Sequence, residues 1–248
     1  MTRLGLLLSL LLLAAGCGTS GASDSSTVAG SIRALENSGA DFQLTVTEVG
    51  TGGDVPKGKY AEQVYASSGE LRDDNAALVL GTKDSGTGMV TPVFDMVVND
   101  SNIFVRPHGS TREWYTSWTF IAEEFIPGVR LNLVRETALL ATKVSHNTNF
   151  SNGAFSNQFV ITPAAEQRRQ LMGFSSSGTL TAFLSTRGNR LQRIDGHFAG
   201  DDPSTKRHIV IDSSLVFTNL GHAAPPKIPS GGVAVQPADL FSTSLTGN

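Results

Sequence analysis

The chain of 248 residues contains a single cysteine, Cys17. A lone cysteine cannot form a disulfide within the chain, so the fold has to be stabilised by packing and not by cross-links. The roughly 230 residues that follow Cys17 are enough for one domain with a sizeable core. We therefore expect one domain without disulfides.

Runs of charge of one sign are also absent. Lys and Arg total 19 against 22 Asp and Glu, and neither sign forms a run of five. Domains that bind nucleic acid, and segments that bind anionic membranes, usually carry clustered basic residues. We expect no nucleic-acid partner and no attachment to a membrane through a basic segment.

The sequence lacks the short motifs that indicate an enzyme or a metal site. It contains no nucleophile elbow, no Ser-x-x-Lys, no His-Glu-x-x-His, no phosphate-binding glycine loop and no paired-cysteine site. The best metal-like group flanks a predicted hairpin turn at a spacing typical of no established site, and consists of His197, Asp201, Asp202 and His208. A solvated turn is the preferred interpretation. We predict no enzymatic activity, no metal and no other cofactor.

The residues that are present favour strands. The 26 Gly and the many Ser and Thr, beside 13 Phe, are typical of β structure with many turns. From Asp41 onward, Phe42, Leu44 and Val46 alternate with polar residues, which predicts a strand with one wet face. Pro92 indicates an edge strand or a bulge, because proline cannot donate to a ladder. Further strands of antiparallel meanders are expected at residues 60–66, 70–80, 89–98, 103–105, 155–161, 179–185, 190–198 and 209–217, with a polar loop at 145–153.

Three helices are predicted from apolar residues spaced three or four apart. The first covers residues 28–35, the second covers 133–144, and the third has Thr162 as its N-cap and ends at Gly173. An aromatic-rich stretch, residues 114–126, precedes the second helix. It is interpreted either as part of a helical lid across the sheet or as filling for the core.

The first seventeen residues have the features of a secretory signal. Arg3 precedes an apolar run, residues 4–15, that is too short to span a bilayer. The stretch LAAGC, residues 13–17, resembles the bacterial lipoprotein signal, which implies that the chain is cut before Cys17 and that this residue is acylated. Two or three acyl chains hold a protein durably on a membrane. We expect an exported protein anchored to the outer face of the cytoplasmic membrane, in the cell envelope.

These features divide the chain into four parts. We expect a signal peptide at residues 1–16, a lipidated cysteine and flexible tether at 17–27, a folded domain at 28–220 and an irregular tail rich in Pro and Gly at 221–248.

The order of these elements, and the phrases ADFQLTVTEVG, SSGELR and NIFVRP, resemble the LppX/LprAFG family of actinobacterial lipoproteins, within the wider LolA/LolB type of lipoprotein carrier. The likeness covers residues 28–220. It implies an α+β, mostly β fold, in which a curved antiparallel sheet forms a half-barrel and helices cover its concave side. It also implies that acyl chains of a lipid or glycolipid lie between the sheet and the helices, and that the site has no catalytic residue.

Apolar residues from the strands and from the predicted lid are expected to line this lipid cavity. They are Phe42, Leu44, Val46, Val64, Leu78, Leu80, Phe94, Val97, Phe104, Phe159, Leu180 and Leu184 on strands, and Trp118 and Phe125 in the lid. The expected partners are the lipid or glycolipid, the membrane that holds the anchor and an envelope transporter. We expect a monomer.

Three other functions fit the same elements. An envelope sensor or regulatory module would bind a protein partner and carry no lipid. An exported hydrolase would need a cluster of titrating groups with shifted pKa values in a cleft. A purely structural envelope protein would have a closed, filled core.

Overall fold

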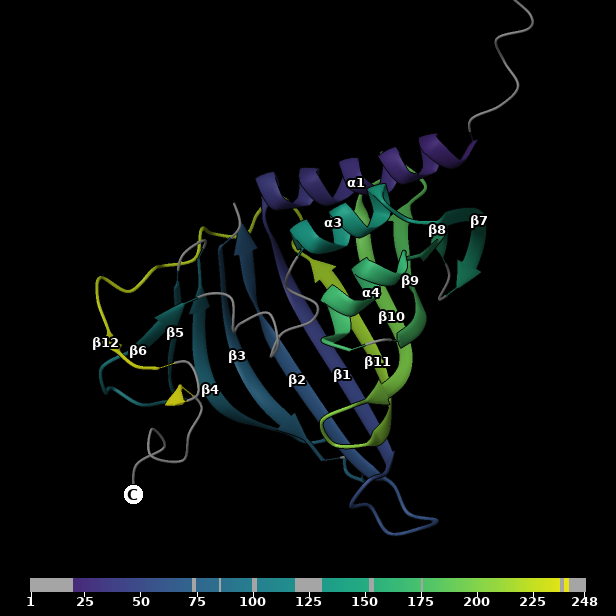
Figure 1. Cartoon of the computed structure of the whole chain (residues 1–248). Coiled ribbons are helices and arrows are strands. Elements are labelled where there is room, and N and C mark those ends of the chain that lie inside the picture. Colours follow the sequence, from purple (N-terminus) through teal and green to yellow (C-terminus); the bar gives the residue numbers. More distant parts are fainter. Residues whose placement is uncertain are drawn as a thin grey trace, which may run out of the picture.

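The computed structural model describes residues 20–72, 75–84, 86–99, 102–118, 131–151, 154–174, 176–236 and 239–240. Within them, a curved sheet carries helices along its upper margin and in front of one half (Figure 1). The helices are α1 (Ser20–Ser38), α3 (Leu131–Leu139) and α4 (Ala165–Met172). The strands are β1 (Ala40–Gly52), β2 (Ala61–Arg72), β3 (Asn75–Lys83), β4 (Val90–Val98), β5 (Asn102–Pro107), β6 (Tyr115–Trp118), β7 (Lys143–Ser151), β8 (Ala154–Thr162), β9 (Ser176–Ser185), β10 (Leu191–Asp202), β11 (Arg207–Thr218) and β12 (Val233–Ala234).

All described strands belong to one sheet with the order β12-β6-β5-β4-β3-β2-β1-β11-β10-β9-β8-β7. Neighbours are antiparallel, except for the short parallel pair of β12 and β6. The long pairing of β1 with β11 joins the N-terminal meander to the C-terminal one. In the described part of the chain no ladder joins the edge strands β7 and β12, so the sheet is open. The predicted fold, mostly β with a curved half-barrel sheet and helices on its concave side, is confirmed.

Two glycines permit the strong curvature of the sheet. A Cβ at Gly69 of β2 would collide with the carbonyl oxygen of Ala77 on β3. A Cβ at Gly178 of β9 would collide with the carbonyl oxygen of His197 on β10. Glycine inside a strand is typical of such close approach between backbones. The sheet can therefore coil more tightly at these positions than a chain with side chains there would allow.

A bulge interrupts the pairing of β3 with β4. Leu80 pairs with Phe94, but Gly81 pairs with Pro92, so Val93 is an extra residue on β4. The bulge accommodates a proline in an interior strand, where its missing N–H would otherwise leave a gap in the ladder. Of the two predicted alternatives for Pro92, an edge strand or a bulge, the structure shows the bulge.

The helices α1 and α3 pack against each other above the sheet. α1 buries Val28, Ile32 and Leu35, and α3 buries Leu131 and Val134. These side chains belong to one apolar cluster that continues over the concave face of the sheet. Among the helices that the structure describes, none has the length and apolar character to cross a membrane.

The helix boundaries correct two predictions. α1 begins at Ser20, so residues 20–27, predicted as flexible tether, are helical. The second predicted helix ends early, at Leu139, because residues from Lys143 onward pair with β8. Beyond Leu139 only Ala141 and Val144 continue the helical apolar pattern, and the ladder with β8 determines the structure there.

The third predicted helix is confirmed with one change at its start. Ala164 and not Thr162 occupies the N-cap of α4, and it makes no side-chain cap. The predicted end at Gly173 is confirmed, since this residue adopts a left-handed φ of 75° and its N–H donates to the carbonyl of Arg169.

Three strands lie where the sequence predicts none: β6, β7 and, in the tail, β12. β6 begins inside the aromatic-rich stretch 114–126, and β7 replaces the predicted polar loop 145–153. β7 is an edge strand with mostly polar residues, so no alternation marks it. The predicted strand 70–80 contains the end of β2 and the start of β3.

The C-terminal tail, residues 221–248, is not irregular throughout. β12 pairs with β6, and Leu240 is fully buried in the apolar cluster. Ala223 is also buried. This part of the tail contributes to the fold.

Candidate functional site

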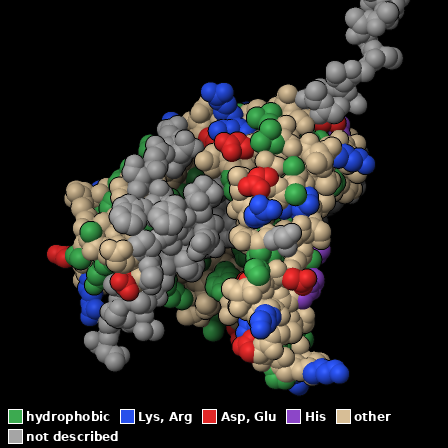
Figure 2. All heavy atoms as spheres, in the orientation of Figure 1, with side chains coloured by type: hydrophobic (Ala, Val, Ile, Leu, Met, Phe, Trp, Pro, Cys, Tyr) green, Lys and Arg blue, Asp and Glu red, His purple; other side chains and the backbone are tan. Residues whose placement is uncertain are grey.

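The concave face of the sheet is apolar across its width. Residues that pair directly on neighbouring antiparallel strands place their side chains on the same face. One such row crosses from β4 to β8 and is interrupted only by Ser67 of β2. Its members are Phe94, Leu80, Ser67, Leu44, Leu215, Ile194, Ala182 and Phe159. In the orientation of Figure 1, Figure 2 shows green hydrophobic side chains among the tan ones near the middle of the molecule.

Nine of the predicted cavity residues lie on this face. Eight belong to the apolar cluster that the sheet shares with the helices, and Leu80 packs against it half-buried. The eight are Phe42, Leu44, Val46, Leu78, Phe94, Phe159, Leu180 and Leu184. Their contact with a ligand stays a prediction.

Three predicted cavity residues point the other way. Val97 and Phe104 pair with each other, one residue away from Met96 and Val105, which face the helices, so they lie on the outer face. Val64 pairs with Thr47 and is on the outer face as well. Val97 lines a shallow hollow there together with Trp114.

Of the two residues predicted to belong to a lid, one lies in a strand and the other lies outside the described residues. Trp118 is the last residue of β6, at the register position opposite Asn102, and so belongs to the sheet. Phe125 lies outside the described residues.

The sequence prediction missed a polar group on the concave face. Glu48 of β1 pairs with Gln63 of β2, and Tyr65 pairs with Val46, which places all three polar side chains on the face of Val46. Tyr65 is 36% exposed. Burial, followed by the negative charge of Glu48, raises the pKa of the Tyr65 hydroxyl. Strict alternation extended from the predicted strand at Phe42 to Val46 would have placed Glu48 on this face.

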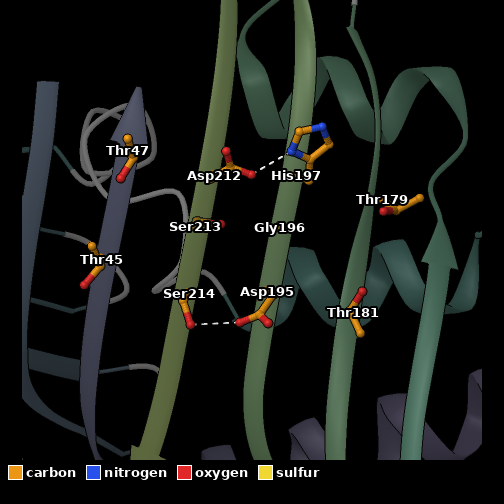
Figure 3. A pocket seen from close by; sticks show the side chains of 10 residues that line it. All are labelled: Thr45, Thr47, Thr179, Thr181, Asp195, Gly196, His197, Asp212, Ser213 and Ser214. Carbon is orange, nitrogen blue, oxygen red and sulfur yellow. Dashed lines mark hydrogen bonds and ion pairs between the residues drawn. The ribbon is translucent and has the colours of Figure 1, made fainter. Parts of the chain in front are cut away.

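The outer face carries a polar hollow of about 350 Å³ (Figure 3). Hydroxyl and carboxylate side chains from β1, β9, β10 and β11 line it, among them Thr45, Thr181, Asp195 and Ser214. Figure 3 shows these side chains directed to the viewer, with helices behind the strands. The hollow therefore lies on the side of the sheet opposite to the apolar cluster.

An imidazole and a carboxylate meet at the rim of this polar hollow. His197 Nδ1 lies 2.6 Å from Asp212 Oδ1, and both side chains are more than half exposed. The Ser214 hydroxyl, on the same face, donates to Asp195 at 2.8 Å and not to the imidazole. This arrangement does not assemble a nucleophile, base and carboxylate in hydrogen-bonded series.

The residues of the metal-like group are used in separate interactions. His208 Nδ1 lies 2.8 Å from Asp201 Oδ1, while His197 pairs with Asp212. Asp202 accepts from the Thr205 hydroxyl and from the hydroxyl and N–H of Ser204 within the β10–β11 turn. No cluster of three potential metal ligands occurs among the described residues.

Among the residues that the structure describes, the three carboxylates with lowered pKa values lie at turns and not together in a cleft. They are Asp54, whose main cause is its hydrogen bond from Arg207, Asp84, held chiefly by the N–H of Thr87, and Asp202, held chiefly by the Thr205 hydroxyl. In each, hydrogen bonds stabilise the ionised form. These shifts reflect turn structure, so they give no support to the hydrolase alternative.

Neither a scan of protein-family models nor a search of curated proteins gives a match. Among solved structures, the lipoprotein LppX of Mycobacterium tuberculosis is 15% identical with a TM-score of 0.49, and the alignment covers 84% of this chain and 98% of LppX. LprF of Mycobacterium bovis is 13% identical with a TM-score of 0.49, covering 87% of this chain and 100% of LprF. A DUF1329 family protein of Desulfovibrio piger is 9% identical with a TM-score of 0.32, covering 90% and 98%. LppX and LprF are members of the LppX/LprAFG family that the sequence resembles.

Proposed function

We propose that the chain is a membrane-anchored lipoprotein that binds acyl chains of a lipid or glycolipid on the concave face of its sheet, and that it carries or presents this lipid in the cell envelope. The observation that carries the proposal is the row of apolar side chains across the concave face of an open sheet. The described helices pack along one margin of this face and against β9. An apolar concave face of this kind suits a flexible apolar ligand.

The energetics favour an acyl chain as that ligand. Burial of each methylene contributes about 0.8 kcal/mol, so a chain of about 16 methylenes gains on the order of 13 kcal/mol before the cost of association. Such binding requires no specific polar contact along the chain. Side chains of Leu, Ile and Phe are sufficient, and these dominate the concave face.

The proposed anchor places this face close to a membrane. Only Gly18 and Thr19 separate Cys17 from the first residue of α1. A fully extended segment of three residues spans at most about 10 Å. If Cys17 is acylated, the start of α1 is held near the lipid surface, from which the protein would receive its ligand.

Binding of cis-parinaric acid, a fluorescent long-chain fatty acid, tests the proposal. Ile211 is half-buried on the concave face beside Glu48 and Phe198, whereas its neighbour Val210 pairs with Val49 on the outer face. We expect Ile211→Trp to weaken binding about tenfold, because the indole occupies space for the acyl chain, and Val210→Trp to leave binding unchanged. Equal effects of the two variants, or no binding by the unaltered protein, would contradict the proposal.

A further inference from the structure

The apolar part of the concave face ends in a polar group of three side chains, at the end of β1 and β2 that lies far from α1 (Figure 1). Glu48 and Gln63 form one cross-strand pair, and Tyr65 lies two residues from Gln63 on the same face. The Tyr65 hydroxyl donates a hydrogen bond to Gln63 Oε1. The three side chains are therefore adjacent and share one orientation.

This polar group borders residues that suit an acyl chain. Val46 precedes Glu48 on the same face of β1 and is buried in the apolar cluster. On the other side, Glu48 pairs with Ile211, which in turn pairs with Phe198. A ligand whose chain lies on Val46 and Ile211 would bring its polar end to Glu48.

The hydrogen-bonding capacity of the group is specific. Because its O–H is engaged by Gln63, the Tyr65 oxygen is left as an acceptor, while the Gln63 amide NH₂ is a donor and the Glu48 carboxylate is an acceptor. Hydroxyl groups of a ligand can donate to Glu48 and accept from Gln63. A sugar or polyol offers several such hydroxyls in a small volume.

The charges on this face disfavour a phosphate. Glu48 forms no ion pair with any described residue, so its negative charge is presented to the ligand. Arg207, on the same face of β11, is held by Asp54 through a hydrogen bond of 2.7 Å from its Nε. A phosphate would face an unpaired carboxylate, and like charges at close range repel.

The geometry points to Glu48, Gln63 and Tyr65 as a head-group subsite that selects a lipid with an uncharged, hydroxyl-rich head group over one with a phosphate. This inference rests on the proposed lipid binding, which supplies the acyl chain on the neighbouring residues. Beyond acyl binding, it specifies the chemical class of the lipid head group and the residues that bind this head group.

Competition between two detergents with the same chain tests the subsite. The purified mature chain carrying Cys17→Ala is loaded with cis-parinaric acid, which is then displaced with dodecyl maltoside or dodecyl phosphate below their micelle concentrations. We expect the maltoside to bind about tenfold more tightly than the phosphate. Glu48→Gln should weaken the binding of dodecyl maltoside about fivefold, because it removes a charged hydrogen-bond acceptor. The same variant should strengthen the binding of dodecyl phosphate, because it removes a repulsive negative charge.

Two further variants separate recognition from structure. Tyr65→Phe should weaken the binding of dodecyl maltoside and leave that of dodecyl phosphate unchanged, since it removes a hydroxyl oxygen and no charge. Thr47→Val, next to Glu48 but on the outer face, should change neither affinity. If Glu48 had only a structural role, Glu48→Gln would change the affinities for both detergents in the same direction.

The failures of the two proposals are distinguishable. If cis-parinaric acid does not bind the unaltered protein, the proposed lipid binding is wrong, and the subsite with it. If parinaric acid binds but the phosphate detergent binds at least as tightly as the maltoside, or Glu48→Gln leaves their ratio unchanged, the subsite is wrong while acyl binding stands.

Discussion

Arg135 of α3 donates a charged hydrogen bond from Nη1 to Glu36 Oε2 of α1, and the two residues are 29% and 7% exposed in their side chains. The pair holds the two helices above the concave face together. A carboxylate buried to this extent is costly without a cationic partner. We expect Arg135→Ala to lower the free energy of unfolding by about 2 to 3 kcal/mol, measured by urea denaturation.

The matched control for this pair is on the same helix. Glu136 is exposed, and no ion pair of its side chain with a described residue is found. Glu136→Ala should change the free energy of unfolding by less than about 0.5 kcal/mol. Similar losses of unfolding free energy in the two variants would show that the ion pair of Arg135 with Glu36 makes no specific contribution to stability.

Asp202 makes stability depend on acid pH. The Thr205 hydroxyl, then the Ser204 hydroxyl and N–H, lower its pKa to about 2 in the folded state, against about 3.9 in an unfolded chain. A depressed folded pKa contributes stability that is complete above the unfolded value and is lost as pH falls towards the folded value. The melting temperature of the unaltered protein should therefore exceed that of Asp202→Asn at about pH 6, with the difference shrinking between about pH 4 and pH 2. A difference that stays constant over this range would contradict the assignment.

Two glycines should respond to alanine in opposite directions. A Cβ at Gly196 on the concave face would lie 2.7 Å from Ser213 Oγ and 3.3 Å from Leu180 Cδ2, so Gly196→Ala should be destabilising by about 1 to 3 kcal/mol. Gly30, exposed in α1, has no atom within 4 Å of such a Cβ, so Gly30→Ala should stabilise the helix by about 0.5 to 1 kcal/mol. Thermal denaturation of both variants checks the pair. A neutral Gly196→Ala would show that the concave face has room at this point.

The anchor prediction depends on Cys17. In cells, Cys17→Ala should abolish incorporation of labelled palmitate and release the protein from the membrane fraction or leave it unprocessed, because the acylated thiol is removed. Replacement of Ser20, three residues later, should alter neither result. A Cys17→Ala protein that still fractionates as an integral lipoprotein would exclude the lipoprotein signal.

Much of the fold could be predicted because burial on one side marks a strand. Phe42, Leu44 and Val46 alternate with residues on the outer face, and β1 lies where this pattern indicates. Where both faces of a strand are apolar, alternation does not tell which residues face the helices. The apolar pattern predicts cavity positions for Val97 and Phe104, whereas the register places both on the outer face.

The polar edge strand β7 and the group of Glu48, Gln63 and Tyr65 are hard to predict because local sequence patterns do not mark them. His146 stacks on Phe159 with 4.4 Å between ring centroids, yet β7 is mostly polar on both faces, so its sequence is typical of a loop. Glu48, Gln63 and Tyr65 become a group only through the pairing of β1 with β2. Register between strands is long-range information that local patterns do not contain.

The most direct test of lipid binding is mass spectrometry of an organic extract from the purified, exported mature chain carrying Cys17→Ala, which has no acyl anchor of its own. We expect co-purified acyl lipid in amounts close to one per protein, strongly reduced by Ile211→Trp on the concave face and kept by Val210→Trp on the outer face. An extract of the Cys17→Ala chain without acyl lipid, or equal amounts of acyl lipid in the two Trp variants, would contradict lipid binding on the concave face.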